Sequence, residues 1–131
     1  MHLTKSELEV MNVIWRAKEP LSRNDIIALS SEHKSWKDSS IHIILNGLLR
    51  KEAIKEDGFV KCNKIYARKF SPLISSEEYY SKALFSAGGK ENVPMLFSAL
   101  LRSDQMTPEL LEELEAMLAE RRTELEKKIN D

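Results

Sequence analysis

The chain has 131 residues, of which 42% are hydrophobic and 31% are charged, and its formal net charge is −1. A single cysteine excludes an internal disulfide, three scattered histidines exclude a zinc-type ligand set, and no apolar run is long enough to span a membrane. The start of the chain lacks the pattern of a signal peptide, so we expect a globular cytoplasmic protein without a metal ion or cofactor.

The charge is divided unevenly along the chain. Residues 1–73 hold 13 Lys and Arg against 9 Asp and Glu, a net charge of +4, whereas residues 74–131 hold 7 against 12, a net charge of −5. A basic first part and an acidic second part indicate that the first part meets a polyanion. A chance distribution of solvated charges is the alternative.

Two short helices are predicted before residue 35. Thr4 and Glu7 form a capping box, and apolar residues at helical spacing follow, which predicts a helix from about Lys5 to Ala17. Ser22 and Asp25 repeat the box pattern, which predicts a second helix of about ten residues before a polar run.

A third helix is predicted after a cap at Asp38 or Ser39. Its apolar residues fall at i, i+3, i+4 and i+7 and are expected to face the core: Ile41, Ile44, Leu45 and Leu48. The opposite side is expected to face outward and carries Ser39, His42, Ile43, Asn46 and Arg50.

Beyond the third helix the pattern changes to that of strands. Residues 53–56 and 59–70 predict two antiparallel strands that end before Pro72. Their turn lies either at Asp57-Gly58 or between Lys61 and Lys64. Three helices and a β-hairpin in this order predict a winged helix-turn-helix, in which the third helix enters the major groove and the hairpin lies along the DNA backbone.

The outward side of the third helix has the chemistry of a base-reading surface. Asn46 can pair with adenine, His42 can bind guanine or phosphate, and Ile43 can contact a thymine methyl group. Gly47 either permits close approach to a backbone or is merely tolerated in the helix. Phosphate contacts are expected from hydroxyl and basic side chains at the helix ends and on the hairpin: Lys37, Ser39, Ser40, Arg50, Lys61 and Lys64.

Each of these polar residues also fits an ordinary solvated helix face. The alternative function is therefore a protein-interaction module that keeps the winged-helix scaffold but no longer reads DNA. An enzyme is not expected, because no nucleophile-base set, phosphate-binding glycine loop or carboxylate pair can be assembled.

Three further helices are predicted in the second part of the chain. The first follows a capping box at Ser75 and Glu78 and includes Ala87, the second covers Glu91 to Arg102, and the third begins at Pro108. We expect a mostly α (α+β) protein with a winged-helix domain at residues 1–73 and a helical dimerisation domain at residues 74–131. The expected dimer contacts are Leu84, Leu96, Leu100, Leu110, Leu111, Leu114, Met117, Leu118 and Leu125. Packing of this apolar stripe against the chain's own first domain is the alternative.

Several stretches resemble the penicillinase repressor (BlaI/MecI/CopY) family over nearly the whole chain. They are ELEVMNVIW at residues 7–15, Trp36, the apolar spacing at residues 41–48, the hairpin end at residues 70–72, and MTPELLEELEAML at residues 106–118. The resemblance implies a homodimeric repressor that binds a dyad-symmetric operator. It also implies that Ser39, Ser40, His42, Ile43, Asn46 and Gly47 match the operator-reading positions.

Two departures from the family bear on induction. In the β-lactam-responsive branch a signalling protease cuts an Asn-Phe bond, and the matching positions here are Ala99 and Leu100, so cleavage at this bond is not expected. A protease that cuts another bond remains an open partner. The chain also lacks the cysteine-rich tail of the copper-responsive branch, so copper sensing of that type is not expected.

Overall fold

A computed structural model describes residues 1–86 and 88–130; Ala87, expected in the fourth helix, lies outside the described residues. Helices dominate, and a β-hairpin that follows the third of them joins a short earlier strand in a three-stranded antiparallel sheet, which confirms the predicted mostly helical winged-helix fold. The chain divides into two compact units, Met1–Ser81 and Lys82–Asp131. Each unit is described by itself below.

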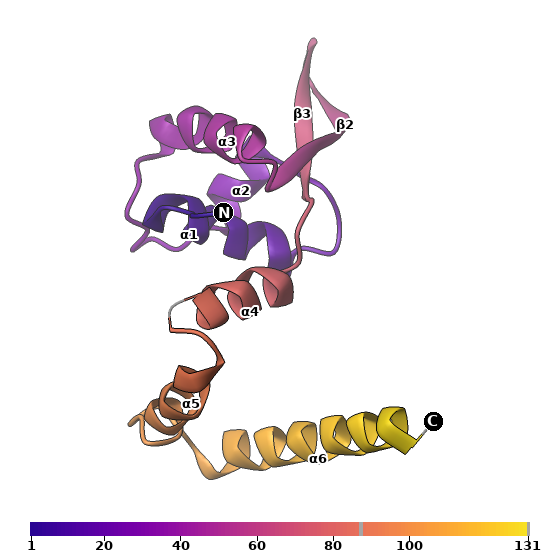
Figure 1. Ribbon diagram of the computed structural model, residues 1–131. Coiled ribbons are helices and arrows are strands. Elements are labelled where there is room, and N and C mark those ends of the chain that lie inside the picture. Colours follow the sequence, from indigo (N-terminus) through magenta and orange to yellow (C-terminus); the bar gives the residue numbers. More distant parts are fainter. Residues whose placement is uncertain (87, 131) are drawn as a thin grey trace. The chain divides into compact units, whose positions relative to one another are not determined.

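The first unit opens with two capped helices, labelled in Figure 1. Helix α1 spans Lys5–Arg16 and α2 spans Arg23–Leu29. Both predicted capping boxes are present, since the Thr4 hydroxyl accepts from the Glu7 amide at 3.2 Å and the Ser22 hydroxyl accepts from the Asp25 amide at 3.2 Å. Helix α2 has seven residues, shorter than predicted, because extended backbone at its C-cap ends it.

Helix α3 covers Ile41–Arg50 and follows a 3-10 turn at Asp38–Ser40. The prediction that Asp38 or Ser39 caps α3 was wrong: neither the turn nor the helix has a side-chain cap, because the turn itself supplies the first backbone hydrogen bond, from the Ser40 amide to the Lys37 carbonyl at 2.8 Å. The loop before this turn instead forms local contacts around Trp36.

The sheet consists of β1 (Leu21–Ser22), β2 (Ile54–Cys62) and β3 (Ile65–Pro72) in the order β1-β3-β2. The hairpin turns at residues 63–64, which decides between the two predicted turns. Asp57-Gly58 instead forms an irregularity in β2, where the register shifts between Glu56 and Phe59 and Gly58 has a φ of 91°. The short strand β1 was not predicted, because its two residues precede a helix and pair only with the distant β3.

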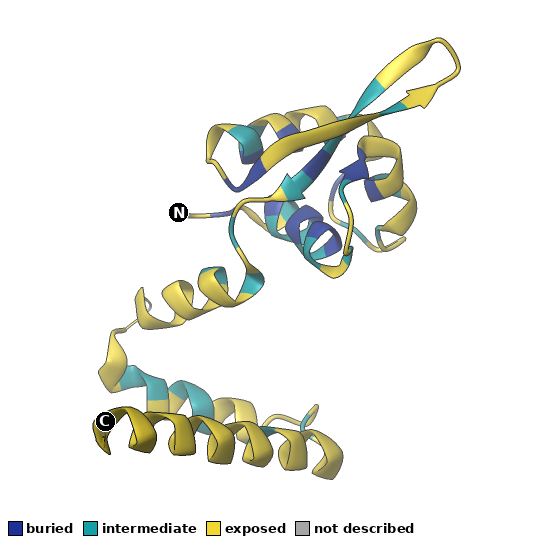
Figure 2. Ribbon diagram, turned by 90° about the vertical axis from the view of Figure 1, so that its right-hand side faces the viewer, coloured by how far each residue is buried: buried dark blue, intermediate teal, exposed yellow. Residues whose placement is uncertain are grey.

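A single apolar core holds the three helices and the base of the sheet together. It contains 15 buried hydrophobic residues, and its fully buried large side chains are Val10, Met11, Ile14, Ile26, Leu45, Leu48 and Ile54. In Figure 2 the dark blue buried segments lie in the helices and strand ends of this unit, while the hairpin tip is yellow. Helix α3 and the base of the hairpin are therefore held in place by a packed core.

Helix α4 (Ser76–Ser86) begins directly after the hairpin and is tied to α1 by aromatic contacts. The Trp15 indole nitrogen donates to the Ile74 carbonyl at 2.9 Å, and the Trp15 ring lies 5.9 Å from the rings of both Tyr79 and Tyr80. The Tyr80 hydroxyl adds a hydrogen bond to Asn12 at 3.3 Å. The first turns of α4 therefore belong to the first unit.

The second unit contains the end of α4, a 3-10 turn at Lys90–Asn92, helix α5 (Val93–Leu101) and helix α6 (Pro108–Asn130). Thr107 caps α6, because its hydroxyl accepts from the Leu110 amide at 3.1 Å. No described residue of α4, α5 or α6 is buried, and these helices are yellow and teal in Figure 2. Among the described residues no helix is long and apolar enough to cross a membrane.

Candidate nucleic-acid interface

Helix α3 has the two faces that its sequence predicts. Ile41, Ile44, Leu45 and Leu48 are buried, whereas the opposite side is exposed: Ser39, His42, Ile43, Asn46 and Arg50. Ile43 is 75% exposed in the middle of this side of the helix. A contact of the helix with another molecule would cover this apolar side chain.

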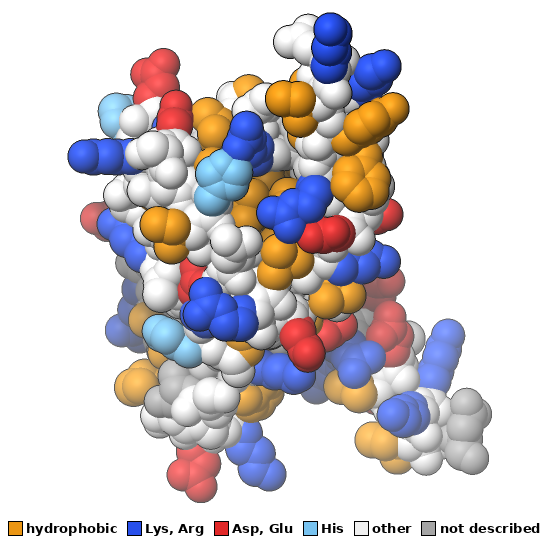
Figure 3. Space-filling model, turned by 90° about the horizontal axis from the view of Figure 1, so that it is seen from above, with side chains coloured by type: hydrophobic (Ala, Val, Ile, Leu, Met, Phe, Trp, Pro, Cys, Tyr) orange, Lys and Arg blue, Asp and Glu red, His pale blue; other side chains and the backbone are white. Residues whose placement is uncertain are grey.

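The view of this side of the molecule in Figure 3 shows Lys and Arg side chains spread among hydrophobic ones. Two arginines lie beside α3: Arg68, one of the hairpin cations expected to supply phosphate contacts, and Arg23, which was not predicted to belong to the site. Arg23, the first residue of α2, contacts His42 through its guanidinium, and Arg68 on β3 pairs with Glu56 at 2.6 Å. A hollow of about 240 Å³ lies between them, with Leu45 in its lining.

Arg23 and His42 are in contact through the guanidinium and Nε2 of the imidazole. A guanidinium only donates hydrogen bonds, so Nε2 accepts in this contact. The other ring nitrogen, Nδ1, remains for an atom on DNA, such as guanine N7 or a phosphate oxygen. The sequence shows Arg23 as a cation at the start of the second predicted helix. Its contact with His42 could not be predicted, because it depends on the packing of α2 beside α3.

Gly47 lies on the side of α3 that approaches α1. A Cβ atom at this position would lie 2.8 Å from Glu7 Oε2, closer than real Cβ contacts. Glu7 is buried with 6% of its surface exposed, and its carboxylate accepts from Lys51 Nζ at 2.5 Å and from the Thr4 amide at 2.9 Å. The absence of a side chain at Gly47 therefore lets α1 and α3 pack closely beside the buried carboxylate of Glu7.

Burial raises the pKa of the Glu7 carboxyl, but the hydrogen bonds from Lys51 and Thr4 and the Lys51 charge outweigh it, so this pKa lies below its ordinary value of 4.5. Lys51 also donates to the His2 carbonyl at 2.8 Å. The ammonium group of Lys51 is thus committed to the start of α1. It ties the end of α3 to the start of α1, a role that the spacing in the sequence did not reveal.

The hairpin carries its basic residues at the tip. Lys61 and Lys64 are exposed on either side of the turn, whose Asn63 has a φ of 59°. Lys61 Nζ lies 6.0 Å from the centre of the Tyr66 ring, and Tyr66 is itself 65% exposed. The free Cys62 is exposed at the same tip. These side chains form a wing with cations and apolar groups on its surface.

The start of α3 brings the remaining predicted phosphate contacts together. Lys37 and Ser39 are exposed, and Ser40 is half-buried at the N-cap of α3. Lys34, one turn earlier, pairs with Asp38 at 2.9 Å. Lys37 is therefore the nearest cation to this helix start without an acidic partner within 4 Å among residues 1–86 and 88–130.

The predicted dimer residues all lie in α4, α5 and α6. Leu96 and Leu114 are half-buried, and the others are exposed to between 38% and 61%: Leu84, Leu100, Leu110, Leu111, Met117, Leu118 and Leu125. Within the described residues, no group of three or more His, Cys, Asp or Glu side chains is placed to hold a metal ion.

Comparison with known proteins gives a family but little functional detail. An "uncharacterized 16.5 kDa protein in ptsI 3′ region" of Latilactobacillus sakei is 33% identical over 88 residues, which are 63% of this chain and 55% of that protein, so the match spans about half of the relative. A crystal structure of a mutant MepR from a multidrug-resistant S. aureus clinical isolate aligns with 92% of this chain and 78% of its own, at 18% identity and a TM-score of 0.45.

The sequence profile of the penicillinase repressor family matches residues 3–120, which include the winged helix and most of the helical part that follows. The chain therefore belongs to the penicillinase repressor family of winged-helix, DNA-binding transcriptional repressors, and it is not an enzyme.

Proposed function

We propose that the chain is a homodimeric repressor that binds a dyad-symmetric DNA operator through α3 and the wing. The observation that carries the proposal is the exposed face of α3, on which His42, Ile43 and Asn46 stand outward from a fully packed inner face. Each of the three has a partner among the base edges of the major groove. Two copies would place two such helices in successive major grooves.

Phosphate contacts supply most of the affinity in this proposal. Exposed cations lie beside α3 and on the wing, where they can reach a phosphate without any change in the protein core. They are Lys37, Arg50, Lys61 and Lys64, together with Arg23. Ser39 and Ser40 offer hydroxyl groups at the helix start. Gly47 lies at the edge of this face and allows it to sit close to a DNA backbone as well as to α1.

Fluorescence anisotropy with DNA from the promoter region of the chain's own gene tests the proposal. A complex at micromolar protein or below is expected, and its affinity should fall by about tenfold or more between about 50 and 200 mM salt, because each phosphate contact releases counterions. Failure to form any salt-sensitive complex, with the fold intact, would favour the alternative of a winged-helix protein-interaction module.

Two sets of variants separate base reading from backbone binding. The double change His42→Ala and Asn46→Ala should remove the preference for the operator over unrelated DNA and leave the dimer intact. The double change Lys61→Gln and Lys64→Gln should weaken binding to every sequence alike and reduce the salt slope by about two. Lys127→Gln with Lys128→Gln removes the same two charges from the last turn of α6, in the second unit, and is the control.

The dimer is assigned to α5 and α6. Helix α6 has 23 residues and is about 34 Å long. One side of this helix carries leucine and methionine while the other sides carry mainly Glu, Lys and Arg, and no residue of it is buried within one chain. An apolar stripe of this length is stabilised when it is covered by another apolar surface, and a second copy offers the matching one.

Relief of repression is proposed not to depend on cleavage between Ala99 and Leu100. This bond lies inside α5, where the Arg102 amide donates to the Ser98 carbonyl at 3.1 Å, so a protease would have to unwind the helix to reach it. The intact mass of the protein, isolated from cells in which the operator is derepressed, tests this. A fragment that begins at Leu100 would contradict it, and cleavage elsewhere would support a signalling protease of different specificity.

A further inference from the structure

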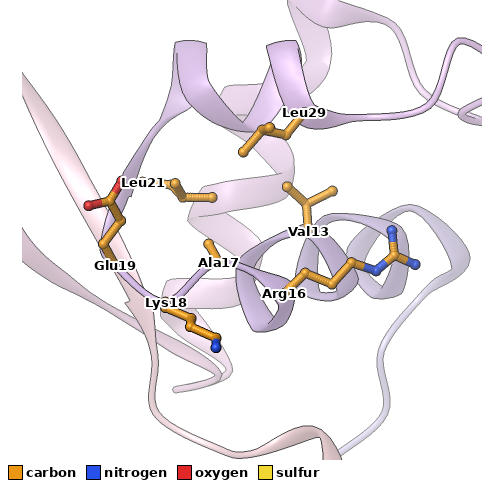
Figure 4. A pocket seen from close by; sticks show the side chains of 7 residues that line it. All are labelled: Val13, Arg16, Ala17, Lys18, Glu19, Leu21 and Leu29. Atoms are coloured by element: carbon orange, nitrogen blue, oxygen red, sulfur yellow. The ribbon is translucent and has the colours of Figure 1, made fainter.

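A hollow that the DNA interface does not use lies between the end of α1, β1 and the end of α2. Its volume is about 460 Å³, within the range of small-molecule sites. Figure 4 shows its apolar side chains pointing toward a common space while charged side chains stand at the rim. The lining residues are Val13, Arg16, Ala17, Lys18, Glu19, Leu21 and Leu29.

Leu29 is the most unusual of the apolar lining residues. It is 60% exposed at the last position of α2, whereas Val13 and Leu21 in the same lining are buried. An apolar ligand in the hollow would cover Leu29 against walls that are already formed. No rearrangement of the core is required.

The polar rim favours an anion. Arg16 and Lys18 have no acidic partner within 4 Å among the residues that the structure describes. Glu9, which lines an adjoining hollow, already accepts from the Ser35 amide at 2.9 Å and the Ser35 hydroxyl at 2.7 Å. Glu19 is the one acidic group at the rim of the larger hollow itself. The rim of the larger hollow therefore carries two unpaired cations and one carboxylate.

The adjoining hollow, of about 200 Å³, borders a tryptophan whose buried indole nitrogen has no hydrogen-bond partner among the described residues. It shares Val13, Arg16 and Leu29 with the larger one and is also lined by Trp36. Trp36 is 7% exposed, and its indole nitrogen has no hydrogen-bond partner in the described part of the chain. A buried N–H without a partner costs free energy, so an acceptor that reached it would stabilise the protein.

We propose that these two hollows form a binding site for a small organic anion, a monocarboxylate with an apolar body. The apolar body covers Val13, Ala17 and Leu29, and the carboxylate receives the forked hydrogen bonds of the Arg16 guanidinium. A base or a cation is disfavoured, because the two unpaired cations, Arg16 and Lys18, outnumber the one carboxylate at the rim, Glu19.

The site has a direct connection to the recognition helix. The segment from Ser30 to Trp36 lines the adjoining hollow, and the 3-10 turn that starts α3 follows at Asp38. A ligand that fixes this segment in one arrangement changes the free energy of presenting α3 to DNA. The regulatory part of the inference rests on the proposed DNA-binding function; the binding part does not.

Two indole N–H signals in the ¹H–¹⁵N NMR spectrum of the full-length protein give an internal comparison. Phenylacetate is the probe, and phenylacetamide is its neutral counterpart. Phenylacetate should shift the Trp36 signal saturably with a dissociation constant below about 1 mM, while the Trp15 signal, held by its bond to the Ile74 carbonyl, stays in place. An absent shift, or equal shifts at both indoles, would overturn the inference.

Variants distinguish the two halves of the ligand. Arg16→Gln should weaken phenylacetate by about tenfold or more and leave phenylacetamide unchanged, because only the acid gains a charge-assisted bond. Leu29→Ala should weaken both compounds. Arg102→Gln changes an exposed arginine of the second unit and is the control. If Arg16→Gln and Arg102→Gln bind phenylacetate equally well, the carboxylate is not held by Arg16 and the assignment fails.

A DNA-binding titration with saturating phenylacetate tests the regulatory part. The affinity of the unmodified protein for its operator should change, and that of Arg16→Gln should not. Unchanged affinity in both proteins would reject regulation while leaving the ligand site in place. Loss of all DNA binding in the absence of phenylacetate would instead contradict the proposed function, whatever the indole signals show.

Discussion

The two units of the chain use their apolar residues in opposite ways. In Met1–Ser81, leucine, isoleucine and valine side chains close a core of 15 buried hydrophobic residues. In Lys82–Asp131, the described helices carry a comparable supply of leucine and methionine without burying one residue. A domain that buries its own apolar side chains can present a rigid surface to DNA, whereas a domain that leaves an apolar surface exposed is suited to bind another molecule through it.

This difference separates residues that determine stability from residues that determine assembly. In the proposed dimer, a change in the first unit affects the stability of one chain, whereas a change on the stripe of the second unit affects the association of two chains. Both tryptophans, Trp15 and Trp36, belong to the first unit, so intrinsic fluorescence reports that unit alone. The following experiments, ordered by expected effect, use this contrast.

The largest effect is expected from Leu48→Ala in α3. Leu48 is fully buried, so the change should lower the free energy of unfolding by about 2–5 kcal/mol through lost burial and a cavity. Ile43→Ala in the same helix removes an exposed side chain and should alter this free energy by about 0.5 kcal/mol or less. Urea unfolding followed by tryptophan fluorescence measures both, and similar losses would contradict the two-faced helix.

The second largest effect is expected from glutamate substitutions on the apolar stripe of α6. The double change Leu111→Glu and Leu118→Glu is expected to raise the dimer dissociation constant by about 100-fold or more, about 2.7 kcal/mol, without moving the fluorescence unfolding midpoint. Ala116→Glu with Thr123→Glu places the same charges on the polar side of α6 and serves as the matched control. Sedimentation velocity is the measurement; a stripe variant that remains dimeric would show that α6 is covered by something else.

A smaller effect is expected at the contact of α1 with α3. Gly47→Ala should gain about 1 kcal/mol of helix propensity. In a chain that keeps Glu7, however, the added Cβ displaces the buried carboxylate of Glu7. The gain should therefore appear only when Glu7→Ala is also present. A double-mutant cycle from urea unfolding is expected to give a coupling of about 1 kcal/mol, and strict additivity would refute the steric account.

The smallest effect concerns pH. Because the pKa of Glu7 in the folded protein lies below 4.5, its ionised form contributes stability that is complete above this value and is lost as the pH falls through the folded pKa. Glu7→Gln should be less stable than the unmodified protein at neutral pH, and the gap should narrow between about pH 5 and pH 3. A gap that is constant over this range would mean that Glu7 acts by packing alone.

Local patterns predicted the parts of the fold that depend on neighbours in sequence. The capping boxes at Thr4 and Ser22, the inner face of α3 and the cap at Thr107 all follow from residues within one or two helical turns. The outward set of α3 followed from the same periodicity. For this reason most of the candidate interface could be named from the sequence.

Features that join distant segments could not be predicted in this way. The strand β1 depends on pairing between Leu21 and Phe70, and the role of Lys51 depends on a carboxylate that lies in α1. The Asp57-Gly58 pair has the composition of a hairpin turn, yet it forms an irregularity in β2 because the strands continue to pair beyond it. In each case tertiary pairing decided among several locally acceptable conformations.

The aromatic contacts between α1 and α4 determine how far the chain can be shortened without disturbing the winged-helix domain. A chain that ended at Leu73 would lose both tyrosines that flank the Trp15 ring, and also the Ile74 carbonyl that accepts from its indole nitrogen. A chain that ended at Ser81 would keep all three contacts. Limited proteolysis should therefore release a stable N-terminal fragment that retains the first turns of α4. The cleavage that separates the two units is expected in or after the last turn of α4.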